Sequence, residues 1–411
     1  MKIAVIGAGL VGLASAHALA DDGHEVVVIE REGPAAGASR GNAGWLAHTD
    51  IDPIASPGML RRVPGYLLDP VGPLAIRARY LLPILPWLGR LLLASRPSQL
   101  AQSIEAIVAI NRLAMPAWDA LSDQLGMAGF IHRRGALFAY DSEVGLSRAR
   151  AHHQRQRAYG ISVDELDGPA LRQMEPELSD ALVGAAFYPD AAHVSDPRLV
   201  TEALFAACNP RGIGFLQAEV GGVTLGDTGV SLALAGQGTV VSERVVIAAG
   251  AWSRPLTAQL GDRIPLDTER GYNVSFPGVT SALSRPVSFD GHGFVASPLE
   301  TGLRIGGAVE LGGLILPPNH DRTRALHAKA QRFLRGVPPI EQGEMWMGHR
   351  PSIPDSLPVI GAAHAARSVL YAFGHGHYGL TQAAATGRIV ADLIAGRTPP
   401  IDLAPFLPQR F

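Results

Sequence analysis

Three glycines near the start of the chain, Gly7, Gly9 and Gly12, are spaced as G-x-G-x-x-G. In this spacing the first glycine permits a tight turn and the second lets the backbone approach a pyrophosphate. The third lets a helix pack closely on a strand. The free N–H groups at the start of that helix attract phosphate oxygens. The spacing therefore predicts a site for the pyrophosphate of a nucleotide.

A glutamate, Glu30, ends the apolar run that follows this first helix. An acidic residue at that place accepts hydrogen bonds from a ribose diol and disfavours a 2′-phosphate. The glycines and Glu30 together predict a dinucleotide with an unmodified adenosine ribose.

A second glycine motif, GHGHYG at 374–379, lies between a strand and a helix near the end of the chain. No strand ending in Asp or Glu follows it, so it lacks the half that would bind a ribose. One long dinucleotide held at both ends is the simpler account. FAD suits this arrangement better than NAD, because a helix N-terminus stabilises the negative charge of a reduced isoalloxazine.

Apolar and alternating stretches of sequence around these motifs predict the strands and helices that position them. Lys2–Ile6 and Glu25–Ile29 are typical of buried parallel strands with a helix between them. Residues 266–276 and 302–310 alternate in polarity, as strands of an antiparallel sheet do. Asp196 is expected to cap a helix that begins at Pro197. The predicted fold is α/β, with a Rossmann-like dinucleotide-binding domain and a second α+β domain built on an antiparallel sheet.

A chain of 411 residues is long enough for two domains. We expect a discontinuous cofactor-binding domain and a discontinuous substrate-binding domain. The cofactor-binding domain would comprise residues 1–58, 196–256 and 345–411, and the substrate-binding domain residues 59–195 and 257–344.

Composition narrows the class of protein. Apolar residues make up 47% of the chain and the formal net charge is −2, so nucleic acid is not an expected partner. Cys208 is the single cysteine, which excludes internal disulfides and multi-cysteine metal sites, and no metal ion is expected. The motif starts too early for a cleavable signal peptide to precede it, which predicts a cytoplasmic protein. The sequence does not indicate an oligomeric state.

The segment Tyr80–Ser95, YLLPILPWLGRLLLAS, is very apolar but too short to span a bilayer. A core or interface helix would explain it. Since arginines lie in and beside it, a helix resting on the inner face of the membrane is the functional alternative.

The motifs together resemble the D-amino-acid oxidase superfamily of FAD-dependent oxidoreductases. The resemblance rests on GAGLVGLASAHALADDGHEVVVIER, ASRGNAGW, VVIAAGAWS, HRPSIPDSLPVIG and GHGHYGLTQAAATGRIVADLI, and it runs from end to end. Within the superfamily the chain is most similar to bacterial D-amino acid dehydrogenases, including D-hydroxyproline dehydrogenase-like members. The resemblance implies non-covalent FAD, with the substrate in a pocket over the flavin.

The resemblance also implies a set of cofactor contacts. These are Gly7, Ala8, Gly9, Leu10, Val11, Gly12, Glu30, Arg31, Ala38, Ser39, Arg40, Asn42, Ala43, Gly44, Trp45, Leu46, Val220, Ala249, Gly250, Trp252, Gly376, His377, Tyr378, Gly379, Leu380 and Thr381.

Four residues are candidates for the substrate and its chemistry: Arg350, Tyr272, His377 and Tyr378. Arg350 matches the arginine that pairs with the substrate carboxylate, and a guanidinium binds carboxylates through two parallel hydrogen bonds. A structural ion pair, for example with Asp355, would also account for it. His48, His292 and His349 are weaker candidates for pocket residues.

The expected reaction oxidises the C–N bond of a D-amino acid, or of a cyclic imino acid such as a proline derivative. A quinone or O₂ would then take the electrons. An N-alkyl amino acid such as sarcosine, or glycine, is the alternative substrate. A flavin monooxygenase and a non-catalytic flavoprotein are alternatives of another class. The monooxygenase class usually carries a Gly-Asp motif before its last helix, where this chain has Gly361-Ala362-Ala363-His364.

Overall fold

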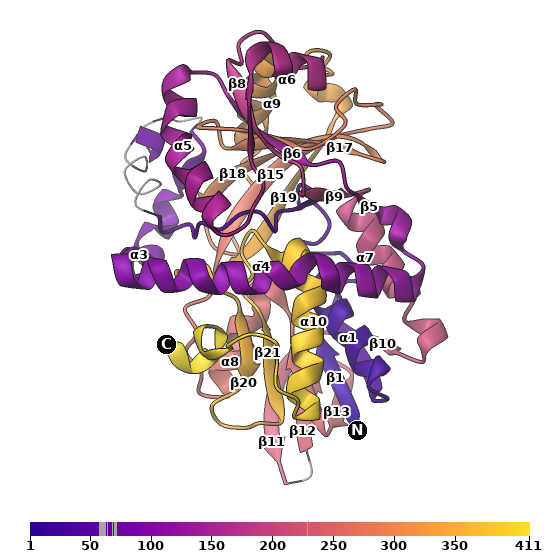
Figure 1. Ribbon diagram of the computed structural model, residues 1–411. Helices are drawn as coiled ribbons and strands as arrows, with labels where there is room; N and C mark the ends of the chain where they lie inside the picture. Colours follow the sequence, from indigo (N-terminus) through magenta and orange to yellow (C-terminus); the bar gives the residue numbers. More distant parts are fainter. Residues whose placement is uncertain (57–62, 64, 68, 70–71, 228) are drawn as a thin grey trace.

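The computed structural model describes residues 1–411 except 57–62, 64, 68, 70–71 and 228. The predicted domain boundary between residues 58 and 59 lies outside the described residues. Figure 1 shows a lower layer built around one sheet, an upper layer built around another, and a long helix between them.

The lower layer is a mostly parallel sheet. Among the described residues it has the order β10 (Gly214–Gln217), β2 (Glu25–Glu30), β1 (Lys2–Ile6), β14 (Arg244–Ile247), β21 (Val369–Phe373) and β20 (Val359–Ala362). All neighbouring pairs are parallel except β20 with β21. The two strands predicted around the first glycine motif are β1 and β2, and they pair directly.

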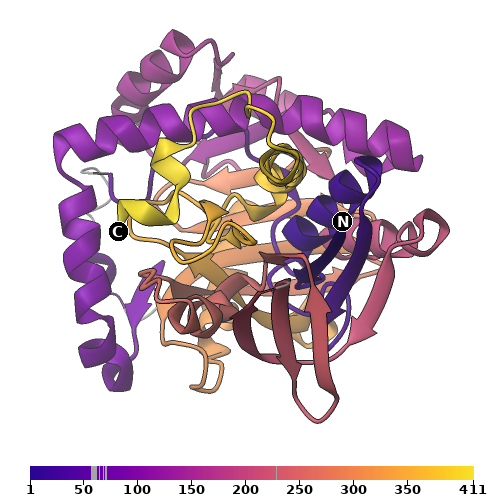
Figure 2. The ribbon, with the colours of Figure 1, turned by 90° about the horizontal axis from the view of Figure 1, so that it is seen from below.

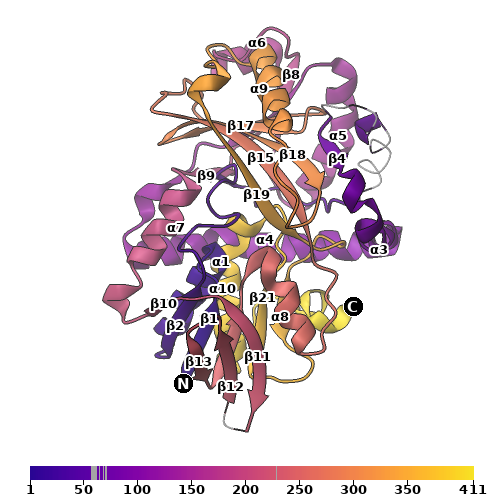
Figure 3. The same cartoon turned by 180° about the vertical axis from the view of Figure 1, so that it is seen from behind.

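Apolar side chains project from both faces of this sheet, as is typical of buried parallel strands. Ile3 and Val5 of β1 pack under helices α1 (Leu10–Asp21) and α10 (Gly379–Ala395). Ala4 and Ile6 pack on the opposite face. That face is covered by α8 (Ser253–Gln259) and by the antiparallel strands β11 (Val220–Gly226), β12 (Gly229–Leu234) and β13 (Gly238–Ser242). Figure 3 shows these strands and α8 from behind.

The upper layer is a largely antiparallel sheet. Among the described residues its order is β19 (Glu344–Ser352), β15 (Asp267–Pro277), β18 (Gly302–Leu311), β17 (Phe294–Leu299), β16 (Val287–Phe289), β6 (Ala136–Tyr140), β8 (Gly184–Tyr188) and β7 (Asp164–Asp167). The short strand β4 (Leu74–Ile76) pairs with β18. The strands predicted at 266–276 and 302–310 are β15 and β18, which are antiparallel neighbours. Helix α9 (Asp321–Phe333) packs on this sheet.

Helices α3 (Leu81–Ala94) and α4 (Pro97–Leu125) follow each other in the chain and run along adjacent sides of the molecule, as Figure 2 shows from below. Helix α4 packs against α10, and its buried Trp118 donates hydrogen bonds to the carbonyl oxygens of Leu380 and Thr381 at 3.0 and 3.2 Å. It belongs to the segment 59–195 that we assigned to the substrate domain. The domain division therefore stays a prediction, in which α4 would reach across to the cofactor domain.

The apolar segment at 80–95 forms helix α3 (Leu81–Ala94), with Ile84 and Trp87 buried and several leucines exposed. No helix among the described residues combines the length and the apolarity needed to cross a bilayer. The cap predicted at Asp196 is confirmed: its Oδ1 accepts a hydrogen bond from the N–H of Arg198, 2.7 Å away, at the start of α7 (Pro197–Ala206).

Helices α1 and α10 touch at a glycine. A Cβ atom on Gly387 would lie 2.6 Å from the backbone carbonyl of Ala14, far inside van der Waals contact. Gly387→Ala should therefore force the helices apart and lower the free energy of unfolding by about 1–3 kcal/mol, the usual cost of overpacking. Denaturant unfolding followed by circular dichroism measures the change.

Gly89→Ala is the matched control, because Gly89 lies inside α3 and nothing approaches its Cβ position within 4 Å. Replacing a helical glycine with alanine in open space should be neutral, or stabilise by about 0.5–1 kcal/mol. Equal stability of the two variants would contradict the close contact between α1 and α10.

Candidate functional site

A cavity of about 1280 Å³ lies between the two layers. It exceeds the roughly 300–1,000 Å³ of common small-molecule sites, and so has room for a long cofactor and a small substrate. Its walls come from the loops at the carboxyl ends of the parallel strands and from β15, β18 and β19. That edge of an open α/β sheet is the usual ligand site.

The first glycine motif forms one end of the cavity. Gly7 has a φ of +112°, and a Cβ atom there would lie 2.5 Å from the carbonyl oxygen of Ala248. A Cβ atom on Gly12 would meet the Gly7 carbonyl. Gly9, at the N-cap position, has no side chain to cap α1, and Ser39 accepts only from the N–H of Leu10, so the start of the helix still presents backbone N–H groups to the cavity.

The carboxylate of Glu30 is fixed beside this motif. One oxygen accepts a hydrogen bond from the N–H of Ala8 at 2.9 Å, and the other accepts from the N–H of Arg31 at 2.8 Å. Arg31 in turn places its guanidinium 4.2 Å from the ring centre of Trp252. These contacts build a polar corner at the end of β2, where a ribose is expected.

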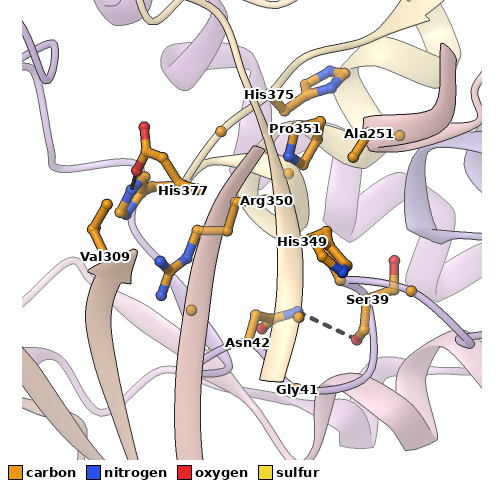
Figure 4. A pocket seen from close by; sticks show the side chains of 18 of the residues that line it. Ser39, Gly41, Asn42, Ala251, Val309, His349, Arg350, Pro351, His375 and His377 are labelled. Carbon is orange, nitrogen blue, oxygen red and sulfur yellow. Dashed lines mark hydrogen bonds and ion pairs between the residues drawn. The ribbon is translucent and has the colours of Figure 1, made fainter. Parts of the chain in front are cut away.

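The Gly- and Ala-rich loop after β2 runs along the cavity and is held from both layers. Ser39 accepts a hydrogen bond from the N–H of Leu10 at 3.0 Å, and Asn42 donates one to the Ser39 carbonyl (Figure 4). From the upper sheet, Arg304 donates to the Asn42 carbonyl at 2.8 Å, and Asn273 donates to the Gly41 carbonyl at 2.7 Å.

The second glycine motif forms the far end of the cavity, where α10 also begins without a side-chain cap. Gly376 and Gly379 lie in the cavity wall. Helices α1 and α10 therefore direct their N-termini at one cavity.

Arg350 projects into this cavity from β19. Its guanidinium lies over Gly271 of β15, where a Cβ atom would be 2.3 Å from Nη2, and its Nη1 donates to the Ala308 carbonyl at 3.0 Å. Ala308 has a φ of +54°, and the pairing of β15 with β18 shifts register beside it. This bulge makes room for the arginine and turns a carbonyl toward it.

Arg350 is not used in a structural ion pair. No carboxylate among the described residues lies within ion-pair distance of it, and Asp355 pairs with Arg410 instead, at 2.9 Å. A half-buried guanidinium with spare donors can therefore bind an incoming carboxylate.

His377 also lies in the cavity wall, near the end of Arg350 (Figure 4). Its Nε2 is 2.9 Å from Oε2 of Glu269, and the hydroxyl of Ser352 donates to Oε1 of the same carboxylate at 2.6 Å. Burial tends to raise the pKa of Glu269. The bonds from His377 and Ser352, with the charge of Arg350, outweigh burial and hold this pKa below its usual value.

The two tyrosines that we predicted as catalytic are placed differently. Tyr272 borders the cavity, but its hydroxyl donates to Glu310 at 2.8 Å and accepts from the N–H of Asn319 at 3.0 Å. The Tyr378 ring is buried away from the cavity, and its hydroxyl donates to the Asp52 carbonyl at 3.2 Å. Both hydroxyls are hydrogen-bonded within the protein, and a catalytic role for either tyrosine stays a prediction.

A match to a family model decides the cofactor. Residues 2–393 match the model described as FAD dependent oxidoreductase, DAO. The chain belongs to this family. It is an FAD-dependent oxidoreductase, and its cofactor is FAD.

Curated relatives match the whole chain. It is 36% identical over 415 residues to a D-amino-acid oxidase of Bradyrhizobium diazoefficiens, with 100% of this chain and 98% of that protein covered. It is 31% identical over 431 residues to a D-amino acid dehydrogenase of Cereibacter sphaeroides, with 100% and 95% covered.

Solved structures confirm the fold class. The glycine oxidase of Geobacillus kaustophilus superposes with a TM-score of 0.77 at 24% identity, covering 100% of this chain and 99% of that one. The L-proline dehydrogenase of P. horikoshii superposes with a TM-score of 0.74 at 21% identity, covering 100% and 97%. These likenesses concern the fold.

The residues of the cavity fit FAD. The backbone cradle at Gly7 and Gly9, fixed Glu30 and the uncapped end of α10 suit a pyrophosphate, a ribose and the polar edge of a flavin. The buried indole N–H of Trp45, in the cavity wall, meets no acceptor among the described residues. When bound, FAD accepts a hydride; the protein binds and orients the partners.

Most predicted FAD contacts line the cavity. These are Gly7, Gly9, Leu10, Val11, Glu30, Arg31, Ala38, Ser39, Asn42, Ala43, Trp45, Val220, Ala249, Gly250, Trp252, Gly376, His377, Gly379 and Leu380. The others do not line it, namely Ala8, Gly12, Arg40, Gly44, Leu46, Tyr378 and Thr381. Thr381, for example, accepts a hydrogen bond from the N–H of Ala47 at 2.9 Å. Their roles toward FAD stay predictions.

Of the three weaker histidine candidates, only His349 lines this cavity, where it packs edge-on against Trp252 at 5.5 Å between ring centres. Burial lowers the pKa of His349 to about 4, so it is neutral near pH 7. His48 lines a smaller neighbouring cavity, and His292 contacts Asp141 at 3.0 Å.

Sequence reasoning missed two carboxylates of the site, Glu269 and Asp50. Glu269 of β15 pairs with Arg350 of β19. No local sequence pattern indicates this pairing between distant strands. Asp50 lies in the cavity wall, where burial raises its pKa to about 7. A raised carboxyl pKa in a cavity is typical of functional sites.

Proposed function

We propose that this FAD-dependent oxidoreductase oxidises the C–N bond of a D-amino acid, or of a cyclic imino acid, to the imino acid. Water then releases the keto acid from an imine formed on a primary amine. The names of the two whole-length relatives, a D-amino-acid oxidase and a D-amino acid dehydrogenase, support the D configuration.

The single observation that carries this proposal is Arg350. Its charged guanidinium lies in the cavity and donates one hydrogen bond to the Ala308 carbonyl. It has no carboxylate partner among the described residues. A substrate carboxylate completes its hydrogen bonds, which fixes Cα with respect to the cofactor. An N-alkyl amino acid or glycine carries the same carboxylate and remains the alternative substrate.

The wall on the substrate side is apolar. Helix α3 and strand β4 contribute Leu74, Ile76, Trp87, Leu88 and Leu91 to it. Apolar walls exclude water from the reacting atoms and give no partner to a charged group. We therefore expect an uncharged, apolar substrate side chain to be favoured.

Arg350→Met tests the proposal. Removing the charge should lower kcat/KM for D-amino acids on the order of 100-fold or more, because truncating a charged partner costs about 2–5 kcal/mol. The FAD content should not change. Arg388→Met, an exposed arginine on α10, is the control and should keep wild-type kinetics. Unchanged kinetics for Arg350→Met would remove this arginine from the site.

We also propose that α3 rests on an anionic lipid surface, from which a quinone takes the electrons. Leu82 and Leu85 of α3 are 77% and 49% exposed, and Leu92 is 60% exposed. Arg79 lies just before α3, and Arg90 lies within it; both are exposed. Exposed leucines beside arginines are the composition of helices that bind membrane surfaces. Leu92 also lines the cavity, so a lipid-soluble acceptor would enter beside α3.

A vesicle assay tests this contact. The double variant Leu82→Asp with Leu85→Asp should bind phosphatidylglycerol vesicles at least about 100-fold more weakly than wild type, since two leucines no longer insert. Neither residue lines the cavity, so activity with a soluble dye should persist.

Val144→Asp is the matched control, because Val144 is 58% exposed on another helix, α5 (Glu143–Ala158). It should bind vesicles like wild type. Equal binding by the double variant would overturn the proposal. So would a dimer in light scattering that the double variant abolishes, because a second copy would then cover α3.

Peroxide release, measured beside reduction of a quinone analogue, distinguishes O₂ from quinone as acceptor.

A further inference from the structure

We propose that His377, oriented by Glu269, takes the proton that the substrate ammonium loses before its C–N bond is oxidised. This inference rests on the proposed function and assigns a proton acceptor within the same site. Glu269 acts as a positioning residue.

Glu269 fixes the His377 ring. Both oxygens of its buried carboxylate are engaged, one by the Ser352 hydroxyl at 2.6 Å and the other by Nε2 of His377 at 2.9 Å. A carboxylate only accepts hydrogen bonds, so the neutral imidazole carries its proton on Nε2. Its Nδ1 is then the basic nitrogen, and the described residues offer Nδ1 no hydrogen-bond partner.

His377 is open to the cavity as well as anchored. Its side chain is 42% exposed, whereas Glu269 behind it is 3% exposed. His375, two residues earlier, is turned inward to Thr386, and burial lowers its pKa to about 3. His375 therefore stays neutral and is not placed to exchange a proton with a substrate.

The strand register brings this pair to the carboxylate site. Glu269 of β15 and Arg350 of β19 lie directly opposite each other. The α-carboxylate and the α-ammonium of an amino acid are joined to one carbon. A substrate held by Arg350 therefore carries its ammonium close to Glu269 of this strand pair and to His377, which Glu269 holds from the loop before α10.

The reaction needs such a proton acceptor. Amino acids are ammonium ions near neutral pH, and an ammonium nitrogen has no lone pair to form the new C=N bond. One ammonium N–H bond breaks and its proton joins Nδ1 of His377, which becomes an imidazolium beside the Glu269 carboxylate. The nitrogen lone pair then forms the C=N bond while Cα loses a hydride, with both electrons, to FAD.

The charges around His377 suit this step. Glu269 faces it from β15 and Arg350 lies on the adjacent strand β19. Asp50 and Asp52 face Tyr378, the next residue in the chain. The negative charge of Glu269 stabilises an imidazolium at His377. Asp50 is the rival acceptor in the same cavity, but among the described residues its side chain has no hydrogen bond or ion pair with β15 or β19, the strands that hold Arg350.

The pH dependence of kcat/KM tests the assignment in the FAD-loaded enzyme. The wild type should lose activity toward low pH as His377 becomes protonated. His377→Gln should lose this acidic limb and fall on the order of 100-fold near neutral pH, the lower range for a positioned base. Glu269→Gln should also lower kcat/KM, because a side-chain amide can donate as well as accept and no longer fixes the proton of His377 on Nε2.

A measurement without turnover separates this role from a structural one. The ¹⁵N imidazole signal of His377, assigned by its loss in His377→Gln, should show a proton on Nε2. In Glu269→Gln, where the amide can donate as well as accept, this fixed tautomer should be lost. Unchanged FAD content and thermal unfolding show that the variants are folded.

Three results overturn the inference: a loss of activity toward low pH that persists in His377→Gln, one that is displaced by Asp50→Asn, or a His377 tautomer that is unchanged in Glu269→Gln. The proposed function fails in a different way, when no D-amino or cyclic imino acid reduces the bound FAD of the wild type.

Discussion

The contact between α1 and α10 determines how this protein holds its cofactor. The two helices come from opposite ends of the chain, yet Gly387 packs directly on the backbone of Ala14. Because they lie side by side on one sheet, both begin at the same edge of that sheet. Two glycine motifs that each resemble a nucleotide site therefore serve a single cavity, and one FAD accounts for both.

A second constraint ties the substrate to that cofactor. The loop after β2 is bound by Arg304 and Asn273 of the upper sheet, so the cavity wall is shared between the layers. On the same sheet, the bulge at Gly271 and Ala308 leaves space for Arg350. The arginine is thus fixed relative to the loop along which FAD is expected to lie. Positioning of this kind supplies much of the rate when a cofactor carries the chemistry.

The local signals in the sequence were sufficient for the cofactor half of the fold. The two strands around the first glycine motif and the helix cap at Asp196 depend on a few neighbouring residues, and the structure confirms both predictions. The family resemblance was also confirmed. Arg350 was identified through that resemblance, and the structure adds that it has no structural ion-pair partner among the described residues.

The parts that sequence reasoning missed depend on contacts between distant segments. Glu269 enters the site only because β15 pairs with β19, and Asp50 because its segment folds over the cavity. Tyr378 lies within a glycine motif, but its ring is directed into the core toward Asp52. Likewise, the packing of α4 on α10 follows from tertiary contacts such as those of Trp118.

The central proposal is that Arg350 binds the carboxylate of the amino acid that FAD oxidises, and the names of the relatives favour the D enantiomer. Anaerobic mixing of the FAD-loaded protein with an apolar D-amino acid, its L enantiomer and the corresponding decarboxylated amine tests it most directly. The account predicts that the D-amino acid bleaches the flavin absorbance, while the L enantiomer and the amine do not. Bleaching by the amine as fast as by the D-amino acid, or by no D-amino or cyclic imino acid at all, would contradict it.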